Sequence, residues 1–290
     1  MTRNLTNGEL ARFLDELLSV DKVQDKYTKN GLSVSANPRR PVRKIGFAVD
    51  ANIETFEKAR IADCDFLIVH HGLFFGNTQS ITNENYNRIR YLIDHNISLY
   101  SVHIPLDVHP KYGNNITLSK MIGAKPVGFY GYGLYSSYPS HSSSHSSQKG
   151  LMTISDIKKR YDSILSGDSL LIGNSGSEKE KVKDVLICSG GGASVLKDFL
   201  ANPYMTYGQL DSGKFDRKYS KLKDILLPRP GLFITGEHDH AISALAKEAR
   251  VPVLFLGHYL SETTGVKELM PVVHKKFNVP VRFIEARTGL

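Results

Sequence analysis

Apolar residues along the chain follow two spacings, one typical of amphipathic helices and one typical of buried strands. Thr6 or Asn7 can cap a first helix. Its apolar positions repeat at i, i+3, i+4 and i+7: Leu10, Phe13, Leu14, Leu17, Leu18. The runs KIGFAVD (44–50) and DFLIVHH (65–71) are almost continuously apolar instead. Such runs predict strands of a sheet that is covered on both faces.

The same alternation continues to the end of the chain. Further helices are expected at 53–62, 86–95, 154–165, 195–200, 241–249 and 265–277. Further strands are expected at 97–103, 182–188, 231–236, 251–257 and 279–285. Strands separated by helices throughout the sequence predict an α/β fold.

The composition changes abruptly between the two halves of this pattern. The stretch SSYPSHSSSHSSQ (136–148) lacks the apolar residues that would offset the entropy of ordering it. We therefore expect an N-terminal α/β half at 1–134, a flexible Ser/His-rich linker at 135–149 and a C-terminal α/β half at 150–290. His141 and His145 are either incidental polar residues or a small metal-binding tract.

Charge and cysteine content limit the setting in which the protein works. The chain of 290 residues carries a net charge of +8, which favours an anionic partner such as a nucleotide, a nucleic acid or a membrane surface. The basic residues are scattered along the sequence, which favours a solvated surface instead. Cys64 and Cys188 lie in apolar runs and do not resemble a disulfide framework, so a reducing compartment is expected. No apolar run reaches the length of a membrane span. We expect a cytoplasmic protein and leave a mitochondrial or nuclear fraction open.

Histidines and acids gather at the ends of three predicted strands. His70 and His71 end the strand at 65–71, and ligands in open α/β sheets bind at the carboxyl ends of strands. Because neighbouring side chains on a strand point in opposite directions, the two imidazoles can each serve a different metal of a pair. The alternative is two histidines that are hydrogen-bonded in a turn.

A second strand end delivers His103 and, four residues later, Asp107. Pro105 between them argues against a continuous helix and for a shaped loop. Asp107 is the better ligand because its carboxylate brings charge to a divalent cation. His103 is either a further ligand or a group that orients Asp107 or a water molecule.

A third strand ends before His258, and Glu262 follows four residues later. If a helix begins here, both side chains share one face, and the longer Glu262 can bridge two ions. Each of the three strand ends therefore carries a histidine with a second histidine or an acid nearby. Together they predict a two-metal site. Such a site activates water and polarises the bond that is attacked.

Two further features lie close to these strand ends. Gly190, Gly191 and Gly192 follow a strand and open a helix, an arrangement that suits a phosphate at the helix N-terminus or a tight turn. Glu237 follows the strand at 231–236 and is a candidate general acid or base, or a brace for His238.

These segments resemble the NIF-like family of GTP cyclohydrolase I type 2 homologues. The resemblance runs from about Asn30 to the C-terminus. Six segments appear in the order seen in that family: GFAVDAN, DFLIVHHGLFF, SVHIPLDVH, LICSGGGAS, LFITGEHDH and FLGHYLSE. In that family two metals are held by the histidines of HHG, the Asp of HIPLD, and the His and Glu of GHYLSE. The resemblance therefore implies the ligands His70, His71, Asp107, His258 and Glu262.

The resemblance also implies two interlocked α/β domains with mixed sheets, a metal site between them and a ring-shaped homo-oligomer, often a hexamer. The chain is similar to the short form, without an inserted domain. It departs from the family pattern at Gly231, where Asp is usual, and at His238-Asp239-His240. The ligand set suits Zn, Fe, Mn or Ni.

Three functions are compatible with these features. The first is a metal-dependent hydrolase that acts on a nucleotide or another phosphate-bearing substrate, with Glu237 or His103 transferring protons. The second is a non-enzymatic metal-binding protein or scaffold with protein partners. Direct nucleic-acid binding is the third, and it rests on net charge without a basic-aromatic motif.

Overall fold

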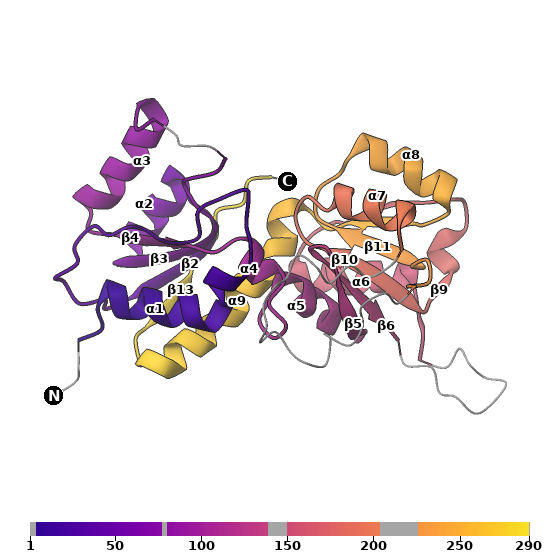
Figure 1. Ribbon diagram of the computed structural model, residues 1–290, viewed down its shortest axis with the longest axis horizontal. Helices are drawn as coiled ribbons and strands as arrows, with labels where there is room; N and C mark the ends of the chain where they lie inside the picture. The colour runs from indigo at the N-terminus through magenta and orange to yellow at the C-terminus, as the bar shows by residue number, and fades with distance from the viewer. Residues whose placement is uncertain (1–3, 77–79, 139–149, 204–225, 290) are drawn as a thin grey trace. The chain divides into compact units, whose positions relative to one another are not determined.

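The computed structural model describes residues 4–76, 80–138, 150–203 and 226–289 (Figure 1). The described chain forms two compact units, each with its own sheet and helices. Unit 1 comprises the described parts of Met1–Leu106 and Gly265–Thr288, and unit 2 those of Asp107–Thr264 and Gly289–Leu290. The predicted α/β class is confirmed.

The sheet of unit 1 has the strand order β1-β4-β3-β2-β13. Its strands are β1 (Gly31–Val34), β2 (Ile45–Asp50), β3 (Phe66–His71), β4 (Ser98–Ser101) and β13 (Val281–Phe283). β1 is antiparallel to β4, and the remaining pairs are parallel. The register places Asp50 opposite His71, so two polar residues meet where β2 and β3 end.

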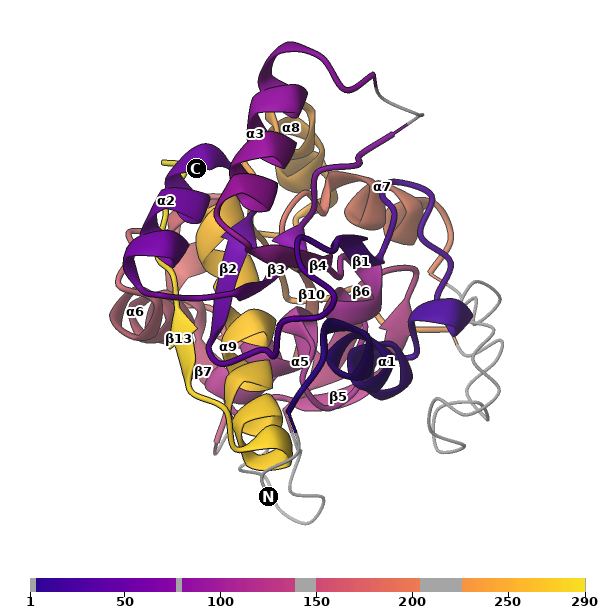
Figure 2. The ribbon, with the colours of Figure 1, turned by 90° about the vertical axis from the view of Figure 1, so that its left-hand side faces the viewer.

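Helices cover both faces of this sheet. They are α1 (Asn7–Leu18), η1 (Val20–Lys22), α2 (Ile53–Ile61), α3 (Asn83–Asp94) and the C-terminal part of α9 (His258–Phe277). Thr6 caps α1 as predicted, in a reciprocal pair with Glu9. Figures 1 and 2 show α2 and α3 on one face of the sheet, and α1 with α9 on the other.

The sheet of unit 2 has the strand order β5-β6-β10-β11-β12-β8. Its strands are β5 (Lys125–Tyr130), β6 (Gly133–Ser137), β8 (Leu170–Ile172), β10 (Asp184–Cys188), β11 (Leu232–Thr235) and β12 (Val253–Phe255). β10, β11 and β12 are parallel and central. β7 (Met152–Thr153) and β9 (Lys181–Val182) form a separate pair.

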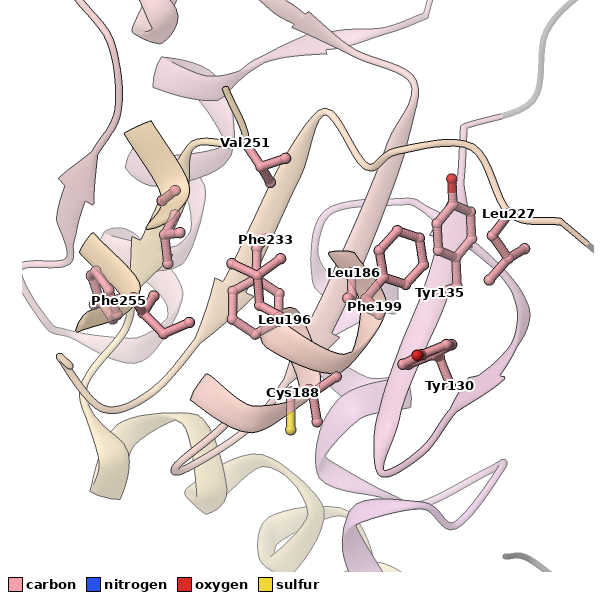
Figure 3. Packing of buried hydrophobic residues seen from close by; sticks show 14 residues of the cluster. Tyr130, Tyr135, Leu186, Cys188, Leu196, Phe199, Leu227, Phe233, Val251 and Phe255 are labelled. Carbon is pink, nitrogen blue, oxygen red and sulfur yellow. The ribbon is translucent and has the colours of Figure 1, made fainter. Parts of the chain in front are cut away.

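Alternate residues along the strands of unit 2 point to opposite faces of the sheet, and each face has its own hydrophobic core. The helices are α4 (Ile104–Asp107, at the boundary of the units), α5 (Asn114–Met121), α6 (Ile154–Leu165), η2 (Ser177–Lys179), α7 (Ala193–Ala201), α8 (His240–Ala249) and the start of α9. Leu186 and Phe233 pack under α7 and α8 in the first core, shown in Figure 3. Val185 and Ile234 pack against α5 and α6 in the second.

The unit boundaries differ from the division expected at 134 and 150. β6 pairs with β10, which binds the segment after Asp107 to the C-terminal sheet. β13 pairs with β2, which returns the chain end to the N-terminal sheet. Both exchanges depend on strand pairing between distant segments and leave no trace in the local composition.

The first residues of the expected linker belong to a strand. Tyr135 and Ser136 lie in β6 and are buried, so the prediction of an exposed loop from residue 135 is wrong for these positions. His141 and His145 lie outside the described residues. Within the described part of the chain, no helix is both long and apolar enough to cross a membrane.

Candidate metal centre

Three histidines of unit 1 lie together at the carboxyl ends of β3 and β4. The rings of His70 and His71 have centroids 4.7 Å apart, and the ring of His103 lies 5.1 and 5.6 Å from them. Each histidine offers one ligand atom, and these three atoms lie within 4.8 Å of one another. Unit 1 alone therefore contains a group of nitrogen donors that could hold a metal ion.

Each of these rings is oriented by an oxygen atom at Nδ1. His70 Nδ1 lies 2.9 Å from the carbonyl oxygen of Val102, and His71 Nδ1 lies 2.8 Å from Asp50 Oδ1. His103 Nδ1 lies 3.0 Å from Asp25 Oδ2. Carbonyl and carboxylate oxygens only accept hydrogen bonds, so Nδ1 carries the proton in each ring. A neutral ring then presents the Nε2 lone pair, which is the pattern of metal-binding histidines.

Asp25 is the most heavily hydrogen-bonded acid in unit 1 among the described residues, and its side chain is 2% exposed. It accepts hydrogen bonds from Asn30 Nδ2 and from the backbone amides of Tyr27 and Ile104, besides its contact with His103. Burial alone would raise the pKa of Asp25, but His103 and these donors outweigh it and lower the pKa to about 2. Asp25 thus stays ionised and fixes His103.

Asp107 of unit 2 ends the short helix α4 and is 6% exposed. The prediction of a loop at Pro105 is wrong. A helix forms here because proline at the second helical position removes no intrahelical hydrogen bond. Asn114 Nδ2 and Ser189 Oγ each donate to Asp107 Oδ1, at 2.8 Å. The carboxylate is therefore held in one orientation.

α9 begins at His258, earlier than the predicted start near residue 265. His258 and Glu262 lie one turn apart, with His258 Nε2 3.3 Å from Glu262 Oε2, as expected for a helix that starts here. Glu237 Oε2 lies 3.2 Å from His258 Nδ1 and plays the same part as Asp50 and Asp25 in unit 1. Glu237 therefore contacts His258, a partner that the sequence did not indicate.

The glycine run lets the backbone approach this pair closely. Gly190 has φ +60°, and a Cβ there would collide with Glu262 Oε1 and lie 3.1 Å from His258 Nε2. The amides of Gly190 and Gly192 donate to Ser261 Oγ and Thr235 Oγ1. These internal bonds favour the tight-turn interpretation. The phosphate site at Gly190, Gly191 and Gly192 stays a prediction.

The candidate ligands Asp107 and Glu262 of unit 2 lie near each other, with one carboxylate oxygen of each within 4.8 Å of the other. Burial raises the pKa of the Cys188 thiol, and the negative charges of Asp107 and Glu262 raise it further. Both carboxylates thus act on one buried thiol at the end of β10. Cys64 and Cys188 are both free and buried.

Each unit brings together the ligands that it contributes to the predicted set. Unit 1 groups His70 and His71 with His103, and unit 2 places His258 beside Glu262. The sequence did not single out the residues that hold these ligands: Asp25, Asp50, Asn114, Ser189. Only Asp50 carried a signal, because it ends a strand of the same sheet as His71. Imidazoles and carboxylates together suit borderline divalent cations, so the donor set fits a metal.

The chain is similar to known proteins over almost its whole length. The sequence profile of the Duf34/NIF3 (NGG1p interacting factor 3) family matches residues 5–204 and 222–289. A "GTP cyclohydrolase 1 type 2 homolog" of Archaeoglobus fulgidus is 33% identical over 284 residues, covering 98% of this chain and 99% of the relative. One of Pyrococcus abyssi is 34% identical, covering 97% and 98%.

A solved structure shares the fold over the whole length. The crystal structure of TTHA1606 from Thermus thermophilus has a TM-score of 0.78 at 28% identity, covering 99% of this chain and all of that one. The family profile spans most of the chain, and the relatives match it from end to end. This chain therefore belongs to the Duf34/NIF3 family.

Proposed function

We propose that the protein binds two divalent cations through His70, His71, Asp107, His258 and Glu262, and that it is a metal-dependent hydrolase. The observation that carries the metal proposal is the orientation of the histidines. His70, His71 and His258 each place an oxygen acceptor against Nδ1. With Nδ1 engaged in this way, each ring keeps Nε2 as the nitrogen that can bind a cation.

The spacing of His258 and Glu262 supports the same proposal. Two ligands bound to one cation at about 2.0–2.2 Å are separated by about 3–3.6 Å in tetrahedral or octahedral geometry. The 3.3 Å between His258 Nε2 and Glu262 Oε2 falls in this range. The second oxygen of Glu262 gives it the reach to bridge to a second cation.

The proposed substrate is a nucleotide or another phosphate-bearing molecule. A pair of divalent cations supplies activation of water and polarisation of the bond under attack. Two carboxylates among five ligands leave the site positively charged, which favours an anionic substrate. His103, fixed by the ionised Asp25, is suited to move a proton at Nε2. We further propose a cytoplasmic, ring-shaped homo-oligomer.

The first test is the metal content. Purified protein is expected to hold two divalent cations per chain after reconstitution, because five protein ligands exceed the three or four of a single site. Elemental analysis of a dialysed sample measures this number. A content of one cation or fewer per chain would contradict the proposed pair.

The second test separates hydrolysis from a metal-dependent scaffold. The metal-loaded protein is screened against nucleotides and phosphoesters, with metal-depleted protein as the control. If Glu237 transfers a proton, Glu237→Gln should lower turnover about 10²–10⁴-fold while metal content is kept, since Gln still accepts the bond from His258. Unchanged turnover would leave Glu237 only the task of orienting His258. No turnover by the wild type would favour the scaffold.

A further inference from the structure

Several buried polar side chains of unit 2 lie around Asp107 or contact the residues that bind it. Asn114, Asn115 and Ser261 are fully buried, and Thr264 is almost fully buried. They surround the first turns of α5 and α9 and the end of β10. Buried polar groups of this kind are costly unless each has a partner, so their arrangement is fixed by hydrogen bonds.

The two donors to Asp107 converge on one atom. Asn114 Nδ2 and Ser189 Oγ both lie 2.8 Å from Oδ1. A carboxylate oxygen has two lone pairs. Two donors at this distance occupy both of them, so Oδ1 has no lone pair left with which to bind a cation.

Both donors are themselves anchored. The backbone amide of Ser189 donates to Asn115 Oδ1 at 2.8 Å, and Asn115 Nδ2 donates to the carbonyl of Tyr132 at 2.8 Å. Thr264 Oγ1 lies 3.2 Å from Asn114 Oδ1. An ionised carboxylate only accepts hydrogen bonds, which also fixes the Asn114 amide with nitrogen toward Asp107.

We propose that Asn114 and Ser189 are positioning residues that make Asp107 a one-oxygen ligand, with Oδ2 as the only atom that binds the cation. This inference rests on the metal site proposed above and adds the geometry of one of its ligands. By occupying Oδ1, the two donors keep the carboxylate from chelating one cation with both oxygens. The hydrogen bonds from Asn114 and Ser189 therefore limit the coordination number of that cation.

The test compares Asn114→Ala, Ser189→Ala and the double variant with the wild type, using Co²⁺ as the probe. Each single variant should weaken Co²⁺ binding, measured by competition with a chelator, and the double variant should weaken it about 10–100-fold. Release of Oδ1 lets Asp107 bind through both oxygens. The visible Co²⁺ bands should then fall in intensity, as the coordination number rises.

Thr117→Val is the matched control on the same helix. Thr117 is buried on α5, and its Oγ1 has no hydrogen-bond partner among the described residues, so loss of the hydroxyl should change neither affinity nor spectrum. Melting temperatures of the metal-free variants report folding separately. If the double variant does not fold, the Co²⁺ spectra of the two single variants test the positioning role.

The outcomes separate this inference from the proposed function. Wild-type affinity and an unchanged Co²⁺ spectrum in both single variants would overturn the positioning role while leaving the metal site intact. An equal loss in Thr117→Val would reduce the effect to general packing and overturn it too. Failure of the wild type to bind Co²⁺ would instead overturn the proposed function and this inference with it.

Discussion

Gly190→Ala is expected to weaken metal binding by about 100-fold, because the new methyl group would occupy the space of the Glu262 carboxylate. The residue also has φ +60°, where a side chain costs about 1–2 kcal/mol. Either Glu262 leaves its position beside His258 or the turn after β10 shifts. Metal content and chelator competition measure the loss, with Glu262→Gln as the comparison for a disabled ligand.

Gly123→Ala separates the collision from the backbone strain. Gly123 has φ +74°, but no described atom lies within 4 Å of a Cβ built there. Both variants should therefore lose a similar amount of stability, and only Gly190→Ala should lose metal. If Gly123→Ala loses metal equally, backbone strain explains the result and the close approach of Gly190 to Glu262 has no special role.

Asp25→Asn is expected to destabilise the protein by about 2–4 kcal/mol at neutral pH, since it replaces a buried acceptor by a group that also donates. The amide cannot accept all the hydrogen bonds that Asp25 receives from Asn30, His103 and the nearby backbone. Chemical denaturation measures the change. Asp94→Asn is the control, because Asp94 forms an exposed ion pair with Arg90 and should leave the melting temperature nearly unchanged.

The pH dependence of the same variant has a definite sign. The pKa of Asp25 falls from its ordinary value of 3.8 to about 2 on folding. Its ionisation therefore contributes roughly 2 kcal/mol above pH 3.8, and this contribution is lost as the pH falls through about 2. The gap in stability between wild type and Asp25→Asn should narrow over that interval. A gap that is constant from pH 6 to pH 2 would exclude the lowered pKa.

Local patterns predicted most of the elements and the candidate ligands that lie on them. The periodicity of α1, the apolar run of β3 and the spacing of His258 and Glu262 each depend on residues that are near in sequence. The start of α9 was placed too late because His258 to Thr264 lack a continuous apolar stripe. In the sequence, Pro105 argues against a helix, but the first turn of a helix tolerates proline.

The residues that orient the candidate ligands could not be predicted in the same way. Asp25 reaches His103 across a separate segment, and Asn114 reaches Asp107 through a turn. Nothing in the spacing of these residues distinguishes them from surface polar groups. Their role depends on tertiary packing, which also determines that β13 joins the sheet of the N-terminal half.

The place of β13 constrains the order in which the chain can fold during synthesis. Residues Asp107–Thr264 of unit 2 are contiguous, so they can begin to fold as soon as they leave the ribosome. The sheet of unit 1 is complete only when Val281 pairs with Ile45, and these two residues are far apart in the sequence. Until the last residues are made, β2 keeps an open edge that can pair with other nascent chains. Newly made chains should therefore depend on chaperones mainly through their N-terminal half.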